Sequence, residues 1–577
     1  MQLVRFMFTI LVIAFFIATL SQRVSAVNYQ ECLSGLQSLC NSTVDGQECN
    51  TSILSGLLDG SGKPTSPNES IAMSYGLCKA YCGTSQEPFS WTNFSQQFSG
   101  WLLPYLALIS QLPFGAKHRL DNLTSMFLTV GSPTLAGYSL IITVLNSRWI
   151  IRRFEVIDYP NADFAVRILI SLQQAPLRVT SEDSLLASLV VLPENDEWWS
   201  ELAQLIDYTH TWSLSAATSI IWVVIAYLFT VVDSLENLDA NINSNGQAVG
   251  SVWLWLLSIV IGWLQLSPKC DYSRISKILG RANAMAFVAS SYGAVKASSR
   301  SRRRAVSIDA VYDNTLFFAD ENRSPPIFNY ARAISWSQSA EEVCDAFCMA
   351  SRNAGSHRPI DPNAEWQDNG KSDDIHLANR MGPPDAVDSY CLAPTDTVRS
   401  RWGSGIFARM CVASLMALLL QWGTTGAALL GVLYTPTTGL GCRSLAYLTY
   451  GIISTLIWMI MVASSVLAHY ASHRPKAGSS RVALFLSESL CWLGKAMATI
   501  NGIGIIAVCV FQFSNVFDTC FCNASVFGRG KSAYSVVYPA IGALDSTRKA
   551  WIGGLVMASG CAVGFVLFVN LVVDSLS

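Results

Sequence analysis

Charged residues within apolar stretches are the features of this sequence whose chemistry would matter most. Glu488 and Lys495 lie well inside the apolar segment 482–513, and Cys491 lies between them. The intervals of three and four residues place these side chains on one face of a helix. Because a charged side chain is costly at the centre of a bilayer, such a face is typical of ion or proton pathways. We therefore predict three intramembrane polar positions, Glu488, Lys495 and Asn501.

The same stretch has a second interpretation, as an interfacial segment. Residues 482–513 exceed the roughly 20 residues that one crossing requires. In this alternative, residues 482–495 lie along the cytoplasmic surface of the membrane and the span begins near Ala496. Glu488 and Lys495 are then outside the hydrocarbon, which disfavours a transporter that is coupled to buried carboxylates.

Sequence signatures of catalysis are missing. The chain has no Gly-x-Ser-x-Gly elbow, no Gly-x-x-x-x-Gly-Lys-Ser/Thr phosphate loop and no His-Glu-x-x-His helix, and its 6 histidines are widely spaced. Cys270, Cys344, Cys348 and Cys391 could form a zinc site, but their scattered spacing favours reduced cytosolic thiols. We predict a protein that is not an enzyme, with no catalytic residue, no cofactor and no metal.

The composition is that of a polytopic membrane protein. Hydrophobic residues make up 51% of the 577 residues and charged residues 14%, and a net charge of -2 gives no global attraction to nucleic acid. Apolar stretches that are long enough to cross a bilayer predict an all-α membrane protein with about seven transmembrane helices. These stretches are 123–145, 214–232, 252–266, 406–433, 445–467, a segment within 482–513, and 551–573.

The first residues predict entry into the secretory pathway. Arg5 precedes an apolar run that ends in a small-residue cleavage site, so residues 1–26 are predicted to be a signal peptide. An uncleaved signal anchor is the alternative. Residues 27–122 are predicted to form a glycosylated ectodomain, because Asn-x-Ser/Thr acceptors are dense there. The predicted glycosylation sites are Asn41, Asn50, Asn68, Asn93 and, in a later outer loop, Asn523.

The cysteines on the predicted outer side are even in number, and they predict disulfides. They are Cys32, Cys40, Cys49, Cys78, Cys82, Cys442, Cys520 and Cys522. Because an odd number of them belongs to the ectodomain, full pairing requires at least one bond between the ectodomain and a loop between spans. The sequence leaves the pairing open.

Segment 101–116 decides the orientation of everything that follows it. The segment is short for a span and contains Pro104 and Pro113. A re-entrant or interfacial helix here would put most lysines and arginines in cytoplasmic loops, as the positive-inside rule favours. In the alternative with eight spans, segment 101–116 crosses the membrane and the basic loop 268–405 lies outside.

The seven-span assignment divides the rest of the chain into three parts. Residues 123–267 contain the first three spans and a cytoplasmic helical loop, 147–212. Residues 268–405 form a basic cytoplasmic loop, which we expect to be largely disordered because it is rich in Ser, Arg, Asn, Asp and Pro. Residues 406–577 contain the last four spans.

Two runs around the first span resemble a group of fungal proteins. The run LPYLALISQLPFG (103–115), followed by FLTVGSPTLA (127–136), is similar to a stretch of large multi-pass membrane proteins of filamentous fungi, a group without an assigned activity. The resemblance covers a few dozen residues and implies a fungal membrane protein, but no function. Independently of it, Gly131-Ser132-Pro133 predicts a kink in the first span.

These features favour a non-enzymatic integral membrane protein of the secretory pathway, and of the plasma membrane in particular. A disulfide-braced outer head and a large cytoplasmic loop favour a receptor or sensor, although the Asp/Glu-Arg-Tyr and Asn-Pro-x-x-Tyr elements are missing. A scaffold requires no further feature. The alternative is a transporter or channel for an unidentified solute. The predicted partners are the lipid bilayer and an unidentified protein or ligand, and no nucleic acid.

Overall fold

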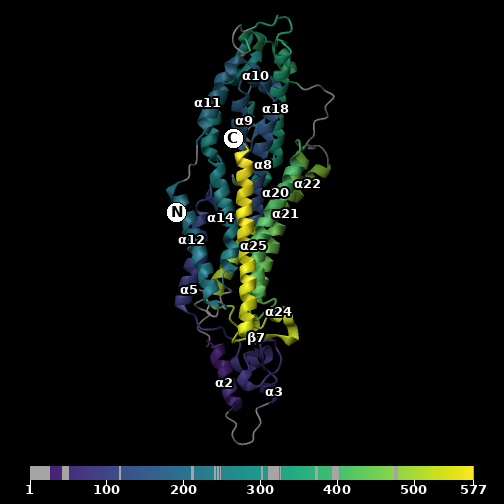
Figure 1. Cartoon of the computed structure of the whole chain (residues 1–577). Coiled ribbons are helices and arrows are strands. Elements are labelled where there is room, and N and C mark those ends of the chain that lie inside the picture. The colour runs from purple at the N-terminus through teal and green to yellow at the C-terminus, as the bar shows by residue number, and fades with distance from the viewer. Residues whose placement is uncertain are drawn as a thin grey trace.

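The computed structural model shows an elongated helical bundle with a small domain at each end (Figure 1). We call the end that carries α2 and β7 the head end, and the end that carries α9, α10 and α18 the helical-domain end. The described residues are 26–41, 51–115, 119–208, 213–238, 248–300, 303–308, 327–368, 375–392, 402–472 and 478–575, together with residues 242, 246, 324 and 370. Residues 1–25 of the predicted signal peptide lie outside them.

Within these ranges, seven helices are long and apolar enough to cross a membrane, as an all-α membrane protein requires. They are α8 (Pro133–Phe154), α12 (Leu214–Glu236), α14 (Ala248–Leu266), α20 (Ile406–Leu433), α21 (Cys442–Ser472), α22 (Gly478–Phe513) and α25 (Ile541–Asp574). Six of the predicted stretches fall within these helices, and α20 has the predicted bounds.

The first predicted span, 123–145, is wrong in its bounds. The chain forms α7 (Arg119–Gly131) and then α8, with a break at Ser132. Pro133 opens α8, where its missing N–H costs no helical hydrogen bond, and the Ser132 hydroxyl accepts from the Leu135 N–H as a cap. The predicted kink is confirmed, and it is a complete interruption of the helix.

The described part of segment 101–116 is largely buried in the bundle. It continues a helical run made of α5 (Trp91–Gln97), the π-helix η3 (Phe98–Leu102) and α6 (Leu103–Ile109). The Trp101 and Tyr105 side chains are buried inside the bundle. The Trp101 ring packs edge-on against Tyr227 of α12, and the Tyr105 ring stacks on Trp253 of α14. This segment thus packs between two long helices, and the prediction of a re-entrant or interfacial helix stays a prediction.

The head domain combines the N-terminal segment with the loop that precedes α25. Its central sheet has the order β1-β2-β7, so residue 73 pairs with residues 57 and 535 on either side. The elements are α2 (Tyr29–Asn41), α3 (Thr51–Leu54), β1 (Leu57–Leu58), η1 (Pro67–Glu69), β2 (Ala72–Ser74), α4 (Tyr75–Leu77), η2 (Cys78–Cys82), α23 (Cys520–Asn523), α24 (Val526–Arg529), η11 (Gly530–Ser532) and β7 (Tyr534–Val536).

Disulfides hold these distant segments together. The described bonds are Cys32–Cys82, Cys78–Cys520 and Cys442–Cys522. Cys40 is also disulfide-bonded, and Cys49 lies outside the described residues. Cys78–Cys520 confirms the expected bond between the N-terminal segment and a loop between spans. This bond places the N-terminal segment and the loop at the same end of the bundle.

The two loops 147–212 and 268–405 build a single helical domain with one apolar core. The expectation that 268–405 is largely disordered is wrong for its described residues. The elements of this domain are α9 (Ala162–Ser171), η4 (Leu172–Gln174), β3 (Arg178–Val179), η5 (Glu182–Ser184), α10 (Leu185–Val191), η6 (Pro193–Asn195), α11 (Asp196–Ile206), α15 (Tyr272–Met285), β4 (Phe287–Ser290), β5 (Gly293–Lys296), α16 (Ala297–Arg300), β6 (Val306–Ser307), η9 (Asn329–Ala331), α18 (Ala333–Gly355), η10 (Leu377–Arg380) and α19 (Pro384–Cys391).

Helix α18 shows why a polar loop folds. Trp336, Val343 and Phe347 recur at helical spacing and are buried, while polar residues occupy the other faces. The Trp336 indole donates to the Leu169 carbonyl across the two loops, and the Phe347 ring packs edge-on against Trp199. Each loop thus supplies half of a core that neither can complete alone.

The disulfide across the head predicts the outcome of a single cut. A protease site inserted at residues 393–400 would divide the chain between Cys78 and Cys520. Under non-reducing conditions we expect the two fragments to migrate together on a denaturing gel, and to separate after reduction. In Cys520→Ser, the fragments should separate without reductant. If the two fragments of the cleaved protein that retains Cys520 separated under non-reducing conditions, the Cys78–Cys520 pairing would be contradicted.

Candidate functional site

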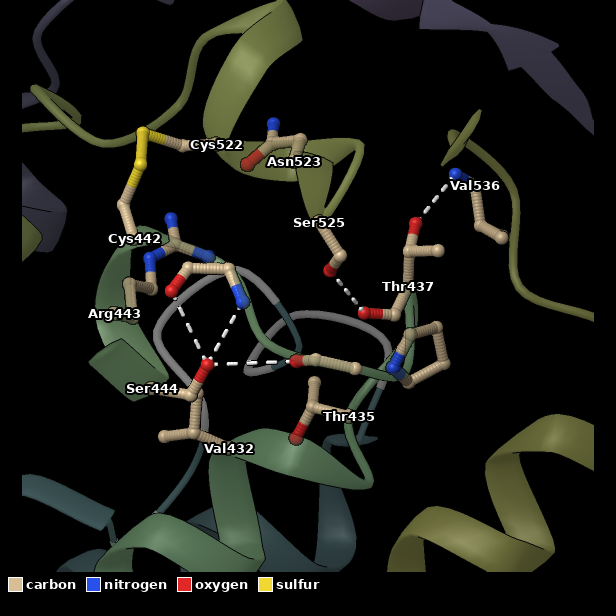
Figure 2. A pocket seen from close by; sticks show the side chains of 13 residues that line it. Val432, Thr435, Thr437, Cys442, Arg443, Ser444, Cys522, Asn523, Ser525 and Val536 are labelled. Atoms are coloured by element: carbon tan, nitrogen blue, oxygen red, sulfur yellow. Dashed lines mark hydrogen bonds between the residues drawn. A yellow bond between two sulfur atoms is a disulfide. The ribbon is translucent and has the colours of Figure 1, made fainter. Parts of the chain in front are cut away.

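A polar pocket lies where the head domain meets the bundle (Figure 2). Its volume is about 50 Å³. Four segments meet around it: the end of α20, the turn before α21, the first turn of α21 and the loop before α25. The lining residues are Val432, Thr435, Pro436, Thr437, Gly439, Gly441, Cys442, Arg443, Ser444, Cys522, Asn523, Ser525 and Val536. We call this cavity the junction pocket.

Hydrogen bonds hold the walls of the junction pocket in place. The Ser444 hydroxyl accepts from the Gly441 N–H at 2.8 Å, which satisfies a free donor before the first turn of α21. The Ser525 hydroxyl donates to the Thr437 carbonyl at 3.0 Å, and the Thr437 hydroxyl accepts from the Val536 N–H at 2.9 Å (Figure 2). Because these bonds tie the turn to the head loop, the pocket is a constructed part of the fold.

The electrostatics of the pocket are set by Arg443, in the first turn of α21. Its guanidinium lies 2.5 Å from an Asp518 carboxylate oxygen, and both side chains are largely buried, at 14% and 2% exposure. The Arg443 Nε is buried and has no hydrogen-bond partner among the described residues. The N-terminus of a long helix also favours negative charge. The pocket therefore presents donors to an oxygen-bearing polar molecule.

Glu87 of the head domain completes a charged cluster with Arg443 and Asp518. Its backbone N–H donates to the Asp518 carbonyl at 3.0 Å, which ties the N-terminal segment to the loop after α22. Burial is the main cause that raises the pKa of the Glu87 carboxyl to about 7; the Asp518 carboxylate adds to this rise, and the Arg443 guanidinium opposes it. The contact between head and bundle is thus sensitive to protons near neutral pH.

A second polar site lies in the middle of the bundle, at the break between α7 and α8. The Gly131 carbonyl accepts from the Asn501 amide at 2.7 Å, and the Val130 carbonyl accepts from the Tyr450 hydroxyl at 2.8 Å. Both carbonyls belong to the last turn of α7, where no helical N–H follows to bond them. The side chains of α21 and α22 therefore complete the broken helix.

The free polar groups at the start of α8 are bonded by side chains of α20 and α21. The Thr134 N–H and hydroxyl both donate to the Gln421 side-chain oxygen, and Ser454 donates to the same oxygen at 2.7 Å. The Ser132 hydroxyl donates to the Ser454 carbonyl at 2.8 Å. We call Gln421, Tyr450, Ser454 and Asn501 the break cluster. Each of these side chains is buried.

Of the predicted intramembrane residues, only Asn501 belongs to the break cluster. Glu488 is exposed and Lys495 is half-buried on α22, which is one uninterrupted helix of 36 residues. The predicted common face therefore does not carry Glu488 into the bundle. Sequence reasoning missed Gln421, Tyr450 and Ser454, because single uncharged polar residues in apolar runs are common. The one signal in the sequence that could have indicated this site was the amide of Gln421 within the apolar stretch 406–433.

The predicted glycosylation sites lie in different surroundings. Asn41 and Asn68 are exposed and hydrogen-bonded to each other at 2.6 Å, and Asn93 is exposed on α5. Asn50 lies outside the described residues. Asn523 lines the junction pocket, and Ser525 of the same acceptor sequence is buried. Glycosylation at these sites stays a prediction.

The cysteines of the predicted cytoplasmic side are free thiols within or beside the helical domain. Cys344 and Cys391 are buried in its core, and Cys348 is half-buried. Among the described residues, no group of three or more His, Cys, Asp or Glu side chains is arranged to hold a metal ion. Comparisons of the chain with protein-family models, with curated proteins and with solved structures find no match.

The raised pKa of Glu87 predicts a pH dependence of stability. Between the ordinary value of 4.5 and about 7, the folded protein retains a proton that the unfolded chain releases, so stability falls as the pH rises through this window and then levels off. In Glu87→Gln this decline should be absent. The difference in Tm between the variant and the wild type should grow between pH 5 and pH 7.

Thermal unfolding in detergent at a series of pH values measures this difference. Glu31→Gln, which removes an exposed carboxylate of the same domain, is the control for loss of a charge. A constant Tm difference across this range would contradict the assignment of the dependence to Glu87.

The break cluster predicts a large cost for Gln421→Leu. The substitution removes the acceptor for the Thr134 N–H, the Thr134 hydroxyl and the Ser454 hydroxyl, and leaves these donors buried. We expect a loss of about 3 kcal/mol or more of stability, since each of the three stranded donors costs about 1–3 kcal/mol. Leu415→Ala on the exposed face of the same helix is the control. Equal Tm values for the two variants would contradict this role of Gln421.

Proposed function

We propose that this protein is a non-enzymatic membrane receptor or sensor that binds a small polar ligand in the junction pocket. The ligand class follows from three groups that line the cavity, namely the Arg443 guanidinium, the Thr437 hydroxyl and the Asn523 amide. These groups suit carboxylate, phosphate or carbonyl oxygens. The observation that carries the proposal is the course of α20, which begins at the helical domain and ends at the pocket.

The pocket end of α20 is tied to neighbouring helices. Val432 lines the cavity in the last turn, and Thr435 follows directly after the helix. The Thr435 hydroxyl accepts from the Trp551 indole at 3.1 Å and donates to the Gly431 carbonyl at 2.7 Å. A ligand that displaced Thr435 would therefore also act on α25.

The opposite end of α20 engages the helical domain through Arg409. The buried guanidinium donates to the Ser337 hydroxyl at 2.7 Å and lies 4.2 Å from the ring centre of Trp149. Trp149 in turn packs edge-on against Trp336 in the core of the helical domain. The side-chain contacts of one arginine thus join α20 to α8 and α18.

Between these ends, α20 is a single helix of 28 residues that carries Gln421 of the break cluster. An uninterrupted helix transmits a displacement from one end to the other more readily than a broken helix does. A ligand shifts the equilibrium between two positions of α20 only if it binds the protein more tightly in one of them. This course of α20 supports a sensor, in which the pocket and the helical domain bias the same element.

The test uses the full chain in lipid nanodiscs and a panel of amino acids, small carboxylates and inorganic phosphate. We expect saturable binding by at least one compound, together with a change in hydrogen exchange within α18. Arg409→Met should keep the affinity within about twofold and lose the α18 response. Arg152→Met, at an exposed arginine of α8, should keep both.

Two results would count against this function. One is the absence of binding by every compound of the panel. The other is a glycan on Asn523 in the mature protein, found by mass spectrometry, because a glycan there would occupy the rim of the pocket. Asn523→Gln is the matched variant, since it abolishes the acceptor sequence and retains an amide.

A transporter is the second candidate, and the break cluster is the observation that favours it. Interrupted helices with buried polar groups at mid-depth are typical of solute sites in transporters. Selective solute flux in liposomes that is lost in Asn501→Leu would support this candidate. Stable co-purifying proteins, without ligand binding or flux, would instead support a scaffold.

A further inference from the structure

We propose that α7 and α8 form a re-entrant hairpin, which enters and leaves the membrane at the helical-domain end, and that residues 91–115 make the first crossing. By length and hydropathy alone, α8 crosses the membrane and residues 91–115 do not. This assignment reverses that. It is independent of the proposed receptor function, because it rests on the path of the chain and not on the junction pocket.

The first step is the path of residues 91–115 beside α14. At the head end, the Trp101 ring lies against Gly250, near the start of α14. Further along, Tyr105 stacks on Trp253. Gly115 contacts the Cys270 backbone, beyond the last residue of α14. Because α14 is itself long enough to cross a membrane, the segment that runs its full length crosses as well.

Helix α12 gives the same result from the other side. Gly100 contacts Thr230, and the Gln111 amide lies 3.5 Å from the Ser219 hydroxyl. The segment therefore runs antiparallel to α12, from its head end toward its other end. The prolines of this segment do not prevent the crossing, because Pro104 lies in the first turn of α6 and Pro113 follows its end.

The second step is the depth of the break. Ser132 contacts Ser454, and Gly131 contacts Asn501. Each partner lies about 18 Å from the head end of its own helix, at 1.5 Å per residue. Since the hydrocarbon core is about 30 Å thick, the break lies well inside the membrane and not at a surface.

The third step is the direction of α7. The link from Gly115 to Arg119 reaches about 14 Å at most, so α7 must begin near the helical-domain end. Its 13 residues span about 20 Å, which brings Gly131 to the observed depth and no further. If α7 began at the head end, this link would have to cover the full length of α14.

The fourth step is the return of the chain along α8. Leu140 contacts Gly262, the Thr143 hydroxyl accepts from Asn329, and Phe154 packs against Phe347 of the helical domain. Helix α8 therefore leads from the break back to the end at which α7 began. Irregular backbone at such a depth is tolerated where it is buried in protein, and the break cluster provides that burial.

The charge distribution supports the same path. Under the assignment in which 101–116 does not cross, Lys117 and Arg119 lie on the side opposite to Arg148, Arg152 and Arg153. The re-entrant path brings Arg119, the first residue of α7, to the end of the bundle that carries Arg148, Arg152 and Arg153, as the positive-inside rule favours. The number of crossings stays at seven, so the head domain and the C-terminus remain on opposite sides.

The test is the sidedness of residue 117 in sealed vesicles that contain the full chain. An impermeant maleimide is applied from either side to Lys117→Cys, with Lys63→Cys as the head reference and Arg358→Cys as the helical-domain reference, and the wild type gives the background. We expect Lys117→Cys to react from the same side as Arg358→Cys. Reaction from the side of Lys63→Cys would overturn the proposal.

A cross-linking experiment decides the outcome if the labelled variant does not fold or does not react. Gln111→Cys with Ser219→Cys should form an oxidative cross-link, because the two native side chains lie 3.5 Å apart. The matched pair Gln111→Cys with Thr230→Cys should not, because Thr230 lies at the other end of α12. The absence of the first cross-link, or formation of the second in its place, would contradict the crossing by residues 91–115.

Discussion

The structure depends on one constraint, which is that a helix broken inside an apolar bundle must find protein partners for its free backbone groups. Water cannot supply them at that depth, and each unsatisfied group would cost several kcal/mol. The break at Ser132 meets this requirement through Asn501 and Tyr450 on one side and Gln421 on the other. Because these partners come from α20, α21 and α22, the break fixes the relative depth of three helices at once. Their register in turn places the pocket at one end and the helical domain at the other.

At the head end, disulfide bonds hold segments together, whereas close packing and hydrogen bonds between helices do so within the bundle. The head domain is small, and small domains with little apolar core gain much of their stability from disulfides. Cys78–Cys520 and Cys442–Cys522 attach the N-terminal segment and the turn before α21 to the same loop. The Arg443–Asp518 pair is buried beneath them and lies in contact with Glu87. The raised pKa of Glu87 means that protonation of its carboxyl changes the charge of this cluster.

At the other end, the helical domain is joined to the bundle by side chains that both parts share. Arg409 of α20 stacks on Trp149 of α8, and the core of the domain continues through Trp336 and Phe347. Within the domain, Arg380 binds both carboxylate oxygens of Asp196 and also the Val191 carbonyl. This arginine connects the loop after α8 to the loop after α14. The two ends of the molecule are thus joined by a continuous packed structure, in which α20 contributes to the junction pocket, the break cluster and the contact with the helical domain.

The sequence by itself determined the membrane class, the number of long apolar helices, the break at Gly131-Ser132-Pro133 and the need for a bond between the N-terminal segment and a loop between spans. These features depend on local composition and on cysteine number, which a single chain displays directly. Only the tertiary structure decided which apolar segment runs the length of the bundle. Aromatic residues such as Trp101 and Tyr105 suit a membrane surface as well as packing inside the bundle, so their sequence positions do not distinguish the two. It also decided that the polar loop 268–405 folds, since its apolar face is completed by residues of the other loop. The partners of the broken helix were beyond the sequence for the same reason: Gln421, Ser454 and Asn501 become one site only when three helices lie side by side.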